Sequence, residues 1–314
     1  MNGVGFAIGQ PMAHSNPPSL QLEGTPQQAN SQEAPGGVHE ITVGVMGQPA
    51  RVFVGGRGER LLLLHGGWGG ASMHWGLVWG RLAERFHVIA PDLPGIGRTD
   101  QGALGSVGAY ARWLVALMDA LDAPGAWCVG NSFGASVACR LATDYPERCL
   151  GLVLVNGIPI PETPRLMRWI GERPLGHRLM RGLEKKIAYS PSALKRGFSD
   201  PAKAPEELRS LVDTESPPQV DAFVDILVQG GSPAPRHFAP LLVWGEDDHL
   251  PGTSVRAARR LHASWPDSKL VLVHGAGHMP QVENSAAFVD ALVSFVAAGS
   301  GTTPARAARD LVGS

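Results

Sequence analysis

Short apolar runs alternate with helical patterns along most of the chain. Four leucines at residues 61–64 are typical of a strand buried on both faces, because such a strand presents no polar position to water. Before them, residues 39–45 and 51–54 alternate with a period of two across a Gly-Gln-Pro turn, which predicts an antiparallel pair. The other predicted buried strands are residues 87–90, 126–129, 150–155, 241–244 and 269–273.

The segments between these strands carry helical spacing. Ser106 is a suitable N-cap for a helix with apolar residues on one side (Tyr110, Trp113, Leu114, Leu117 and Leu121). Strands that alternate with helices and consist of continuous apolar runs form mostly parallel sheets. The sequence therefore predicts an α/β fold, with a mostly parallel central sheet and helices on both faces.

One interval has no strand pattern. Residues 158–239 contain only helix-like segments separated by prolines and glycines. We expect them to form an inserted helical cap over the carboxyl edge of the sheet, where open α/β sheets bind ligands. Within residues 161–203, ten side chains are basic and four are acidic. This excess indicates either a basic lip for an anionic substrate or solvated helix faces, and the second is the more common meaning of a charge run.

The two ends of the chain have a different composition from the middle. Residues 1–37 are rich in Pro, Gln, Ser, Asn and Gly without periodicity, which predicts a disordered arm. Residues 299–314 are expected to be a flexible tail. The predicted core then comprises residues 38–157 and 240–298.

Composition and charge narrow the functional classes. The 314 residues carry a formal net charge of -1, which gives no support for nucleic acid or an anionic membrane as a partner. The three cysteines lie in or beside apolar runs, so we expect buried thiols and a reducing compartment. We identify no signal peptide and no apolar run of about 18 residues, and therefore expect a cytoplasmic protein.

A serine stands where a strand is predicted to turn into a helix. In Gly130-Asn131-Ser132-Phe133-Gly134, the glycines remove side chains that would clash in a tight turn, and the helix directs its positive end at the serine. The pattern is weak alone in a chain with 40 glycines. A serine nucleophile also needs a base, a carboxylate that orients the base, and donors for an oxyanion. We predict Ser132 as the nucleophile and look for these partners at strand ends.

Position along the chain decides among the 11 histidines. His278 follows the last buried strand on a glycine-rich loop, from which an imidazole could lie over the nucleophile, so we predict it as the base. His274, at the strand end, is expected to be packed, and His65 is expected to support the glycine loop after the first buried strand. No such placement is found for His74, His87 or His249.

The carboxylate candidates are Asp92, Asp100, Asp247 and Asp248. A backbone hydrogen bond of the Asx type accounts for Asp92 in its tight Pro-Asp-Leu-Pro-Gly turn. The fourth buried strand ends in Asn156, which cannot supply the charge that stabilises an imidazolium. This leaves the pair after the strand that ends at Trp244, and of that pair we choose Asp248.

The oxyanion donors are expected from two loops. The backbone N–H of Phe133 points into the site from the helix start, and Gly67 in the loop after the first buried strand is the expected second donor. Trp68 and Met279, beside Gly67 and His278, are predicted to line the substrate pocket.

Five motifs follow one another along the chain in the order typical of the α/β-hydrolase superfamily. Together they resemble its capped, single-domain branch. The resemblance covers about residues 39 to 298 and implies the α/β-hydrolase fold, with Asp248 as the acid and Gly67 as an oxyanion donor. Haloalkane dehalogenases and epoxide hydrolases of this fold use an aspartate where Ser132 stands, and prolyl iminopeptidases differ at Trp68 and around Ser132. The motifs are His65-Gly66-Gly67-Trp68-Gly69, residues 91–97, residues 130–134, residues 245–251 and Gly277-His278.

The motif at residues 130–134 resembles that of esterases and also that of the carbon-carbon bond hydrolases that cut ring-cleavage products. We therefore expect a serine hydrolase that cleaves a carboxylic ester through an acyl-enzyme. The alternatives are a thioesterase, a hydrolase of a vinylogous 1,5-diketone, and a receptor-like binding protein of the same fold. A triad of this kind implies no metal and no organic cofactor. The expected partner is a small-molecule substrate, without nucleic acid or membrane, and the oligomeric state stays open, a homodimer included.

Overall fold

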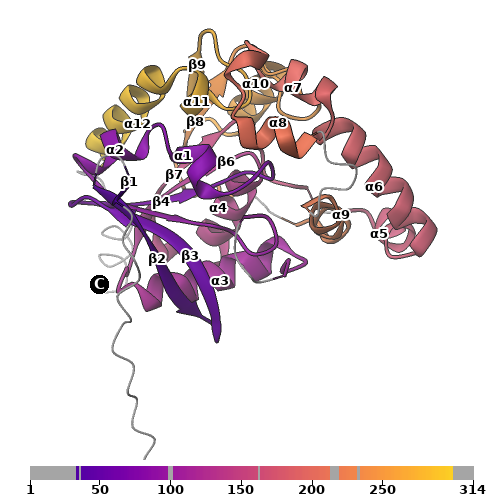
Figure 1. Ribbon diagram of the computed structural model, residues 1–314, viewed down its shortest axis with the longest axis horizontal. Helices are drawn as coiled ribbons and strands as arrows, with labels where there is room; N and C mark the ends of the chain where they lie inside the picture. Colours follow the sequence, from indigo (N-terminus) through magenta and orange to yellow (C-terminus); the bar gives the residue numbers. More distant parts are fainter. Residues whose placement is uncertain are drawn as a thin grey trace, which may run out of the picture. The chain divides into compact units, whose positions relative to one another are not determined.

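The protein is described here by a computed structural model, which covers residues 33–34, 37–97, 102–161, 163–212, 219–231 and 234–299. Within them lies one sheet of nine strands in the order β1-β2-β3-β5-β4-β6-β7-β8-β9 (Figure 1). The strands from β4 onward pair in parallel, whereas β1, β2 and β3 pair antiparallel, as does β3 with β5. The strands are β1 (Glu33–Ala34), β2 (Val38–Val45), β3 (Gln48–Gly55), β4 (Arg60–Leu64), β5 (His87–Pro91), β6 (Ala126–Asn131), β7 (Cys149–Val155), β8 (Leu241–Gly245) and β9 (Lys269–Val273).

Helices connect the parallel strands, as the alternation of patterns predicts. Ser106 caps α3, since its Oγ accepts from the N–H of Ala109 at 3.3 Å. The helices are α1 (Ala71–Trp75), α2 (Trp79–Ala83), α3 (Val107–Ala120), α4 (Phe133–Asp144), α5 (Arg165–Gly171), α6 (Pro174–Ala188), α7 (Pro191–Gly197), α8 (Glu206–Val212), α9 (Gln219–Gln229), α10 (Val255–Ser264), α11 (Pro280–Glu283) and α12 (Ser285–Gly299).

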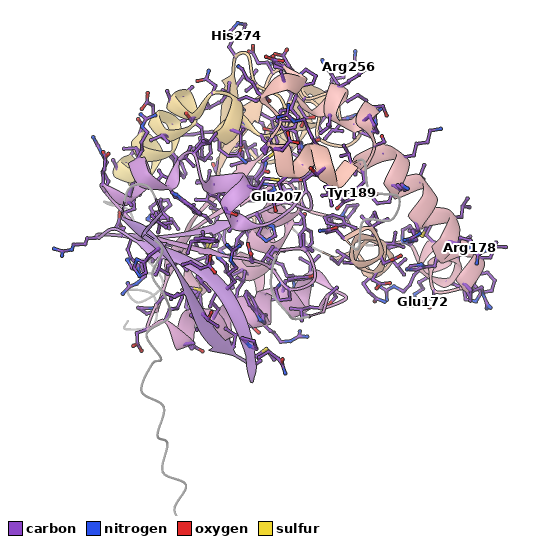
Figure 2. All side chains as sticks on the ribbon, in the orientation of Figure 1. Glu172, Arg178, Tyr189, Glu207, Arg256 and His274 are labelled. Atoms are coloured by element: carbon purple, nitrogen blue, oxygen red, sulfur yellow. The ribbon has the colours of Figure 1, made fainter. Side chains whose placement is uncertain are left out.

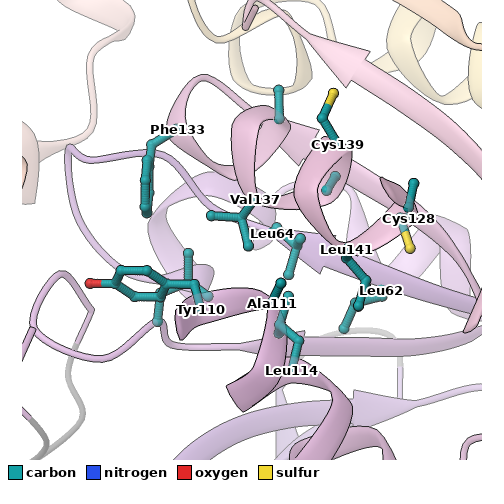
Figure 3. Packing of buried hydrophobic residues seen from close by; sticks show 14 of the residues in the cluster. Leu62, Leu64, Tyr110, Ala111, Leu114, Cys128, Phe133, Val137, Cys139 and Leu141 are labelled. Carbon is teal, nitrogen blue, oxygen red and sulfur yellow. The ribbon is translucent and has the colours of Figure 1, made fainter. Parts of the chain in front are cut away.

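The leucine run of β4 shows why a continuous apolar strand is needed here. Side chains of a strand alternate between its two faces, and both faces of this sheet are covered. Leu62 and Leu64 belong to a core that includes residues of α3 and α4 (Figure 3). Leu61 and Leu63 belong to a second core that includes residues of α1, α2 and α12. The predicted α/β fold with helices on both faces is confirmed.

The ends of the predicted core need two small corrections. Glu33 and Ala34 fall within the predicted disordered arm, but they form β1 and pair with β2. Gly299 falls within the predicted tail, but it is the last residue of α12, where it packs against Trp127. The rest of the predicted arm, apart from Gly37, and the tail from residue 300 lie outside the described residues.

The helices between β7 and β8, which we name the inserted helices, are α5, α6, α7, α8 and α9. No strand occurs in the described residues between Val155 and Leu241. A third apolar cluster, separate from the two sheet cores, joins α7 and α8 to the loops at the carboxyl ends of the strands. It includes Trp68, Tyr189, Phe198 and Met279. This cluster fixes part of the insertion above the sheet edge.

Two predictions from composition concern the whole chain. All three cysteines are buried and free. Burial raises the pKa of the Cys139 thiol far above its ordinary value, so this group is protonated at neutral pH. No helix in the described ranges is both long and apolar enough to cross a membrane.

Candidate active site

Ser132 stands at a sharp turn between β6 and α4. Its φ is 55° and its ψ is -116°, a conformation that a side chain adopts only under constraint. The turn leaves no space at the flanking glycines: a Cβ on Gly130 would lie 2.2 Å from the carbonyl oxygen of Gly134, and one on Gly134 would lie 2.2 Å from that of Leu64. The glycine spacing is therefore a steric requirement of this turn, as the sequence predicts.

His278 and Asp248 lie in contact although 30 residues separate them. His278 Nδ1 is 2.8 Å from Asp248 Oδ2, and both side chains are almost completely buried. Asp247 points elsewhere and accepts a hydrogen bond from the Ser199 hydroxyl at 2.8 Å. The structure thus places Asp248, and not Asp247, against the predicted base.

Asn156, which cannot serve as the triad carboxylate, contacts Asp248 directly. Its side-chain N–H donates to Asp248 Oδ2 at 2.8 Å, and its Oδ1 accepts from the N–H of Gly245 at 3.0 Å. Asp248 Oδ1 accepts from the N–H of Leu250 at 2.9 Å. Asn156 lacks the charge of a triad acid, but its amide holds the acid in place. Its position directly after a buried strand, at the sheet edge where the other site residues were expected, could have indicated this contact.

The loop that carries His278 is held from two sides. Glu283 in α11 accepts from the N–H of Gly277 at 2.6 Å and from the N–H of Ser199 at 2.9 Å. The side-chain N–H of Asn131, the residue before the nucleophile, donates to the carbonyl oxygen of His278 at 3.1 Å. Burial raises the pKa of Glu283 above its ordinary value. These bonds fix the backbone of the predicted base relative to β6 and the inserted helices.

Two other sequence predictions have different outcomes. His65 supports the glycine loop as predicted: its Nε2 accepts from the N–H of Leu93 at 2.7 Å, and its Nδ1 contacts the carbonyl oxygen of Gly66 at 2.7 Å. His274, predicted to be packed, is 96% exposed and lies 3.0 Å from Glu246, projecting away from the molecule (Figure 2). The prediction for His274 is wrong, because the chain turns outward at the end of β9.

Asp92 accepts a hydrogen bond from a backbone N–H 21 residues away, whereas the expected Asx-type bond is local to the turn. Its Oδ1 accepts from the N–H of Ala71 at 2.6 Å, and its Oδ2 lies 3.1 Å from Arg51. Asp92 therefore ties the loop after β5 to the start of α1. Asp100, the fourth carboxylate candidate, lies outside the described residues.

A cavity of about 280 Å³ contains most of the predicted site. Ser132, His278, Gly67 and Phe133 all line it, and so does Trp68. Trp68 meets His278 edge-on at 5.0 Å between ring centroids. Met279 is fully buried in the third apolar cluster and is absent from the residues that line the cavity. The other described residues that line the cavity are mainly apolar, and residues of α6 and α9 form its side opposite the sheet.

The glycine loop after β4 lies directly under the inserted helices. A Cβ on Gly67 would lie 2.3 Å from the Phe223 ring, so a larger residue here would have to displace that ring of α9. The carbonyl oxygen of Gly67 accepts from the Tyr189 hydroxyl at 2.8 Å. Burial, followed by the charge of Glu184, raises the pKa of Tyr189 well above its ordinary value, so this donor stays protonated. The residue that follows α6 thereby orients a predicted oxyanion loop.

His74 lines the cavity although its sequence position gave no reason to select it. Its Nδ1 lies 2.9 Å from Asn131 Oδ1 and 3.4 Å from the backbone nitrogen of Gly66. Burial, followed by the charge of His65, lowers the pKa of His74 well below its ordinary value. Its ring is therefore neutral, and its Nε2 has no hydrogen-bond partner among the described residues.

Glu184 brings the one carboxylate among the described cavity-lining residues. It comes from α6, and burial raises its pKa above the ordinary value. No Lys or Arg is among the described residues that line this cavity. Nor do the described residues contain a cluster of three or more His, Cys, Asp or Glu side chains arranged to hold a metal ion.

Comparisons with known proteins agree with this fold. An uncharacterized protein of Mycobacterium tuberculosis is 30% identical, over 77% of this chain and 76% of its own. A 2-hydroxy-6-oxo-6-phenylhexa-2,4-dienoate hydrolase of Burkholderia cepacia is 27% identical, over 78% of this chain and 90% of its own. A pimeloyl-(acyl-carrier protein) methyl ester esterase of Serratia marcescens is 29% identical, over 77% and 96%.

A solved structure shares the fold. The thermophilic esterase from Thermogutta terrifontis superposes with a TM-score of 0.62 at 22% identity, covering 83% of this chain and 98% of that chain. A family model described as the alpha/beta hydrolase family matches residues 61–291. Since this match covers well over half of the sequence, the chain belongs to the alpha/beta hydrolase family.

Proposed function

We propose that the protein is a serine hydrolase that cleaves neutral carboxylic esters. Ser132 is the nucleophile, His278 the general base, and Asp248 the carboxylate that orients His278. The single observation that carries this proposal is the shared cavity: a constrained serine and a histidine already paired with a buried carboxylate line the same space of about 280 Å³.

The chemistry would proceed in two halves. His278 takes the proton of the Ser132 hydroxyl as the oxygen attacks the ester carbonyl, and the negative charge passes to the carbonyl oxygen. The N–H groups of Gly67 and Phe133 hold this oxyanion, and His278 then returns the proton to the leaving alcohol. A water molecule activated by the same imidazole releases the acid from Ser132. Asp248 stabilises the imidazolium in both halves, since its charge lies 2.8 Å from Nδ1.

Glu184 favours a neutral substrate over an anionic one. The dienoate named for the Burkholderia cepacia relative carries a carboxylate, and the described lining of this cavity offers it a glutamate and no Lys or Arg. Two carboxylates in a shielded space repel each other. The apolar lining instead suits a small or medium apolar acyl or alcohol group. We therefore favour an ester substrate, as in the esterase relative from Serratia marcescens, over the carbon-carbon bond alternative.

The inserted helices act in this proposal as a cap. Residues of α6 and α9 line the cavity opposite Ser132, so these helices decide which substituents fit. A thioester would react by the same steps. It differs from an oxygen ester only in its leaving group, a thiol in place of an alcohol. A receptor-like role is disfavoured because the paired base and acid, the nucleophile and the predicted oxyanion loop occur together.

Labelling with a fluorophosphonate tests this proposal. We expect the probe to modify Ser132, as identified by peptide mass spectrometry, and expect esters of short apolar acids to protect it. Dienoates of the ring-cleavage type should protect it poorly. An unmodified Ser132 in the folded protein, or equal protection by dienoates and neutral esters, would remove the basis for the proposed chemistry or the proposed substrate class, respectively.

A further inference from the structure

Exposed apolar side chains are concentrated on two inserted helices. The described residues include eight large hydrophobic side chains that are strongly exposed, and six of them belong to α5 and α6. Leu175 is 80% exposed and Leu179 is 73% exposed. Helices α5 and α6 pack against each other, and exposed apolar side chains that gather on neighbouring helices point to an interaction site, whereas single exposed leucines do not. The six residues, which we name the apolar face, are Leu166, Met167, Trp169, Leu175, Leu179 and Leu183.

The spacing along α6 separates the apolar face from the cavity. Leu175, Leu179 and Leu183 recur every four residues and therefore form one stripe. Glu184 and Ile187, which line the cavity, lie on another side of the same helix. In Figure 2, Arg178 projects outward from α6, whereas Tyr189 at the helix end lies toward the interior. One helix thus contributes both to the cavity wall and to an exposed surface.

Cations accompany the apolar face. Residues 165–188 contain seven Arg or Lys side chains and two glutamates, and one of these, Glu184, lines the cavity. Arg178 and Lys186 are exposed and lie on the same side of α6 as the leucine stripe. The guanidinium of Arg173 lies 3.9 Å above the Trp169 ring. The segment therefore combines apolar side chains with a positive excess in its own sequence, although Arg181 is paired with Asp221 of α9 and the whole chain has a net charge of -1.

We propose that the apolar face and its cations bind the surface of an anionic lipid bilayer. Helices that lie in a membrane interface combine Leu or Trp on one side with flanking Lys and Arg, because the apolar groups insert and the cations meet anionic headgroups. Dimerisation through this face is less favourable, since two-fold symmetry would bring the same cations of two copies together. An isolated solvated helix would not need the leucine stripe.

This inference departs from the expectation that no membrane takes part. That expectation used the net charge of the whole chain, which averages the basic segment with acidic segments elsewhere. Because α6 also lines the cavity, binding at the apolar face would bring the cavity close to the lipid. Apolar esters dissolved in the bilayer would then lie close to the cavity and could enter it as substrates. Lipid binding itself does not depend on the proposed hydrolysis.

Vesicle co-sedimentation of the full chain tests the proposal. The probes are vesicles of phosphatidylcholine alone and vesicles with about 30% phosphatidylglycerol. We expect binding to the anionic vesicles that weakens with salt, and little binding to the neutral ones. The variant Leu175→Gln/Leu179→Gln/Leu183→Gln should lose most of it, and Arg178→Gln/Lys186→Gln should weaken it about fivefold per cation removed. Leu77→Gln, at a leucine that is 65% exposed outside this face, is the matched control and should bind like the wild type.

Each outcome decides the proposal. It is supported if only the variants of the apolar face and its cations lose binding while their melting temperatures stay at the wild-type value. It is overturned if the wild type stays in the supernatant, or if Leu77→Gln loses as much binding as the leucine variant. A wild type that elutes as a dimer, with the leucine variant as a monomer that binds vesicles equally well, would assign the face to a second copy instead. Hydrolysis of a water-soluble ester, measured in parallel, tests the proposed reaction separately.

Discussion

The two walls of the cavity are built in different ways. The sheet-side wall, formed by Gly67, Ser132 and His278, comes from loops at the carboxyl ends of parallel strands. Buried hydrogen bonds hold it, as those from Asn131 to His278 and from Asn156 to Asp248 show. The helix-side wall, formed by Glu184, Ile187, Tyr189 and Phe223, is mainly apolar and belongs to the inserted helices.

This difference separates two tasks. Groups that move protons need fixed positions, because a small displacement of a reacting atom costs much of the rate. Groups that select a substrate need only the right shape and charge. We therefore expect changes in the sheet-side wall to act on turnover and changes in the helix-side wall to act on substrate preference. The following predictions test that division, from the largest expected effect to the smallest.

Ser132→Ala should remove nearly all turnover. Loss of the nucleophile of such a triad lowers kcat by about 10⁶-fold. Hydrolysis of a neutral ester and labelling by a fluorophosphonate measure the effect, with the melting temperature as a check of folding. Ser136→Ala, another serine that lines the cavity, should keep the labelling. Turnover by Ser132→Ala within tenfold of the wild type would show that the sheet-side wall does not carry the reaction.

Asp248→Asn should lower kcat by about 10⁴-fold, because a neutral amide no longer stabilises the imidazolium and favours the wrong tautomer of His278. Asp247→Asn is the matched control, since Asp247 contacts Ser199 and not His278. Its kcat should stay close to that of the wild type. Steady-state kinetics with one neutral ester compare the two. If both variants lose the same activity, the pairing of Asp248 with His278 has no special role.

Glu184→Gln should change preference more than turnover. The kcat/KM for an anionic hemisuccinate ester should rise about tenfold relative to the kcat/KM for a neutral butyrate ester. The reason is that the substitution removes a repulsive charge from the cavity, where solvent screens it only partly. Glu172→Gln, in the link between α5 and α6 and outside this cavity, should leave the ratio unchanged. An equal change in kcat for both esters would place Glu184 in the catalytic step and break the proposed division.

The same ratio should depend on pH. The pKa of Glu184 is raised by burial, so its carboxylate becomes neutral as the pH falls through this raised value, and discrimination against the anionic ester should then decrease. Any pH dependence of turnover that the two esters share cancels in the ratio. The Glu184→Gln variant should show no such pH dependence.

Tyr189→Phe should have the smallest effect, since it removes one hydrogen bond between the two walls. Loss of the bond to the carbonyl oxygen of Gly67 should cost about 1 kcal/mol of unfolding free energy and lower kcat only a few-fold. Tyr110→Phe removes a comparable bond, to the carbonyl oxygen of Pro94, between two residues that do not line the cavity, and it keeps the ring that meets Phe133 edge-on. It should lower the melting temperature similarly without changing kcat. If the two variants have the same kinetics, the contact between the walls does not position the glycine loop.

Much of the sheet-side wall could be predicted from the sequence. The proposed nucleophile and the proposed base lie at the ends of apolar runs, and parallel strands bring such ends to one edge. Asn156 and His74 were missed for a physical reason. Their roles depend on which partner lies opposite, Asp248 in one case and Asn131 in the other, and those partners are 92 and 57 residues away. His274 was misjudged because a strand end does not reveal whether the chain turns inward or outward.

The sequence by itself determined the strands, the strained turn at Ser132 and the order of the chemical groups, because these follow from local steric rules and from side-chain periodicity. Only the tertiary structure decided which side of α6 lines the cavity and which side is exposed. The leucine stripe and Glu184 lie on different sides of one amphipathic helix. The local sequence does not distinguish an apolar side that is buried from one that is exposed. That assignment depends on what the rest of the chain packs against the helix.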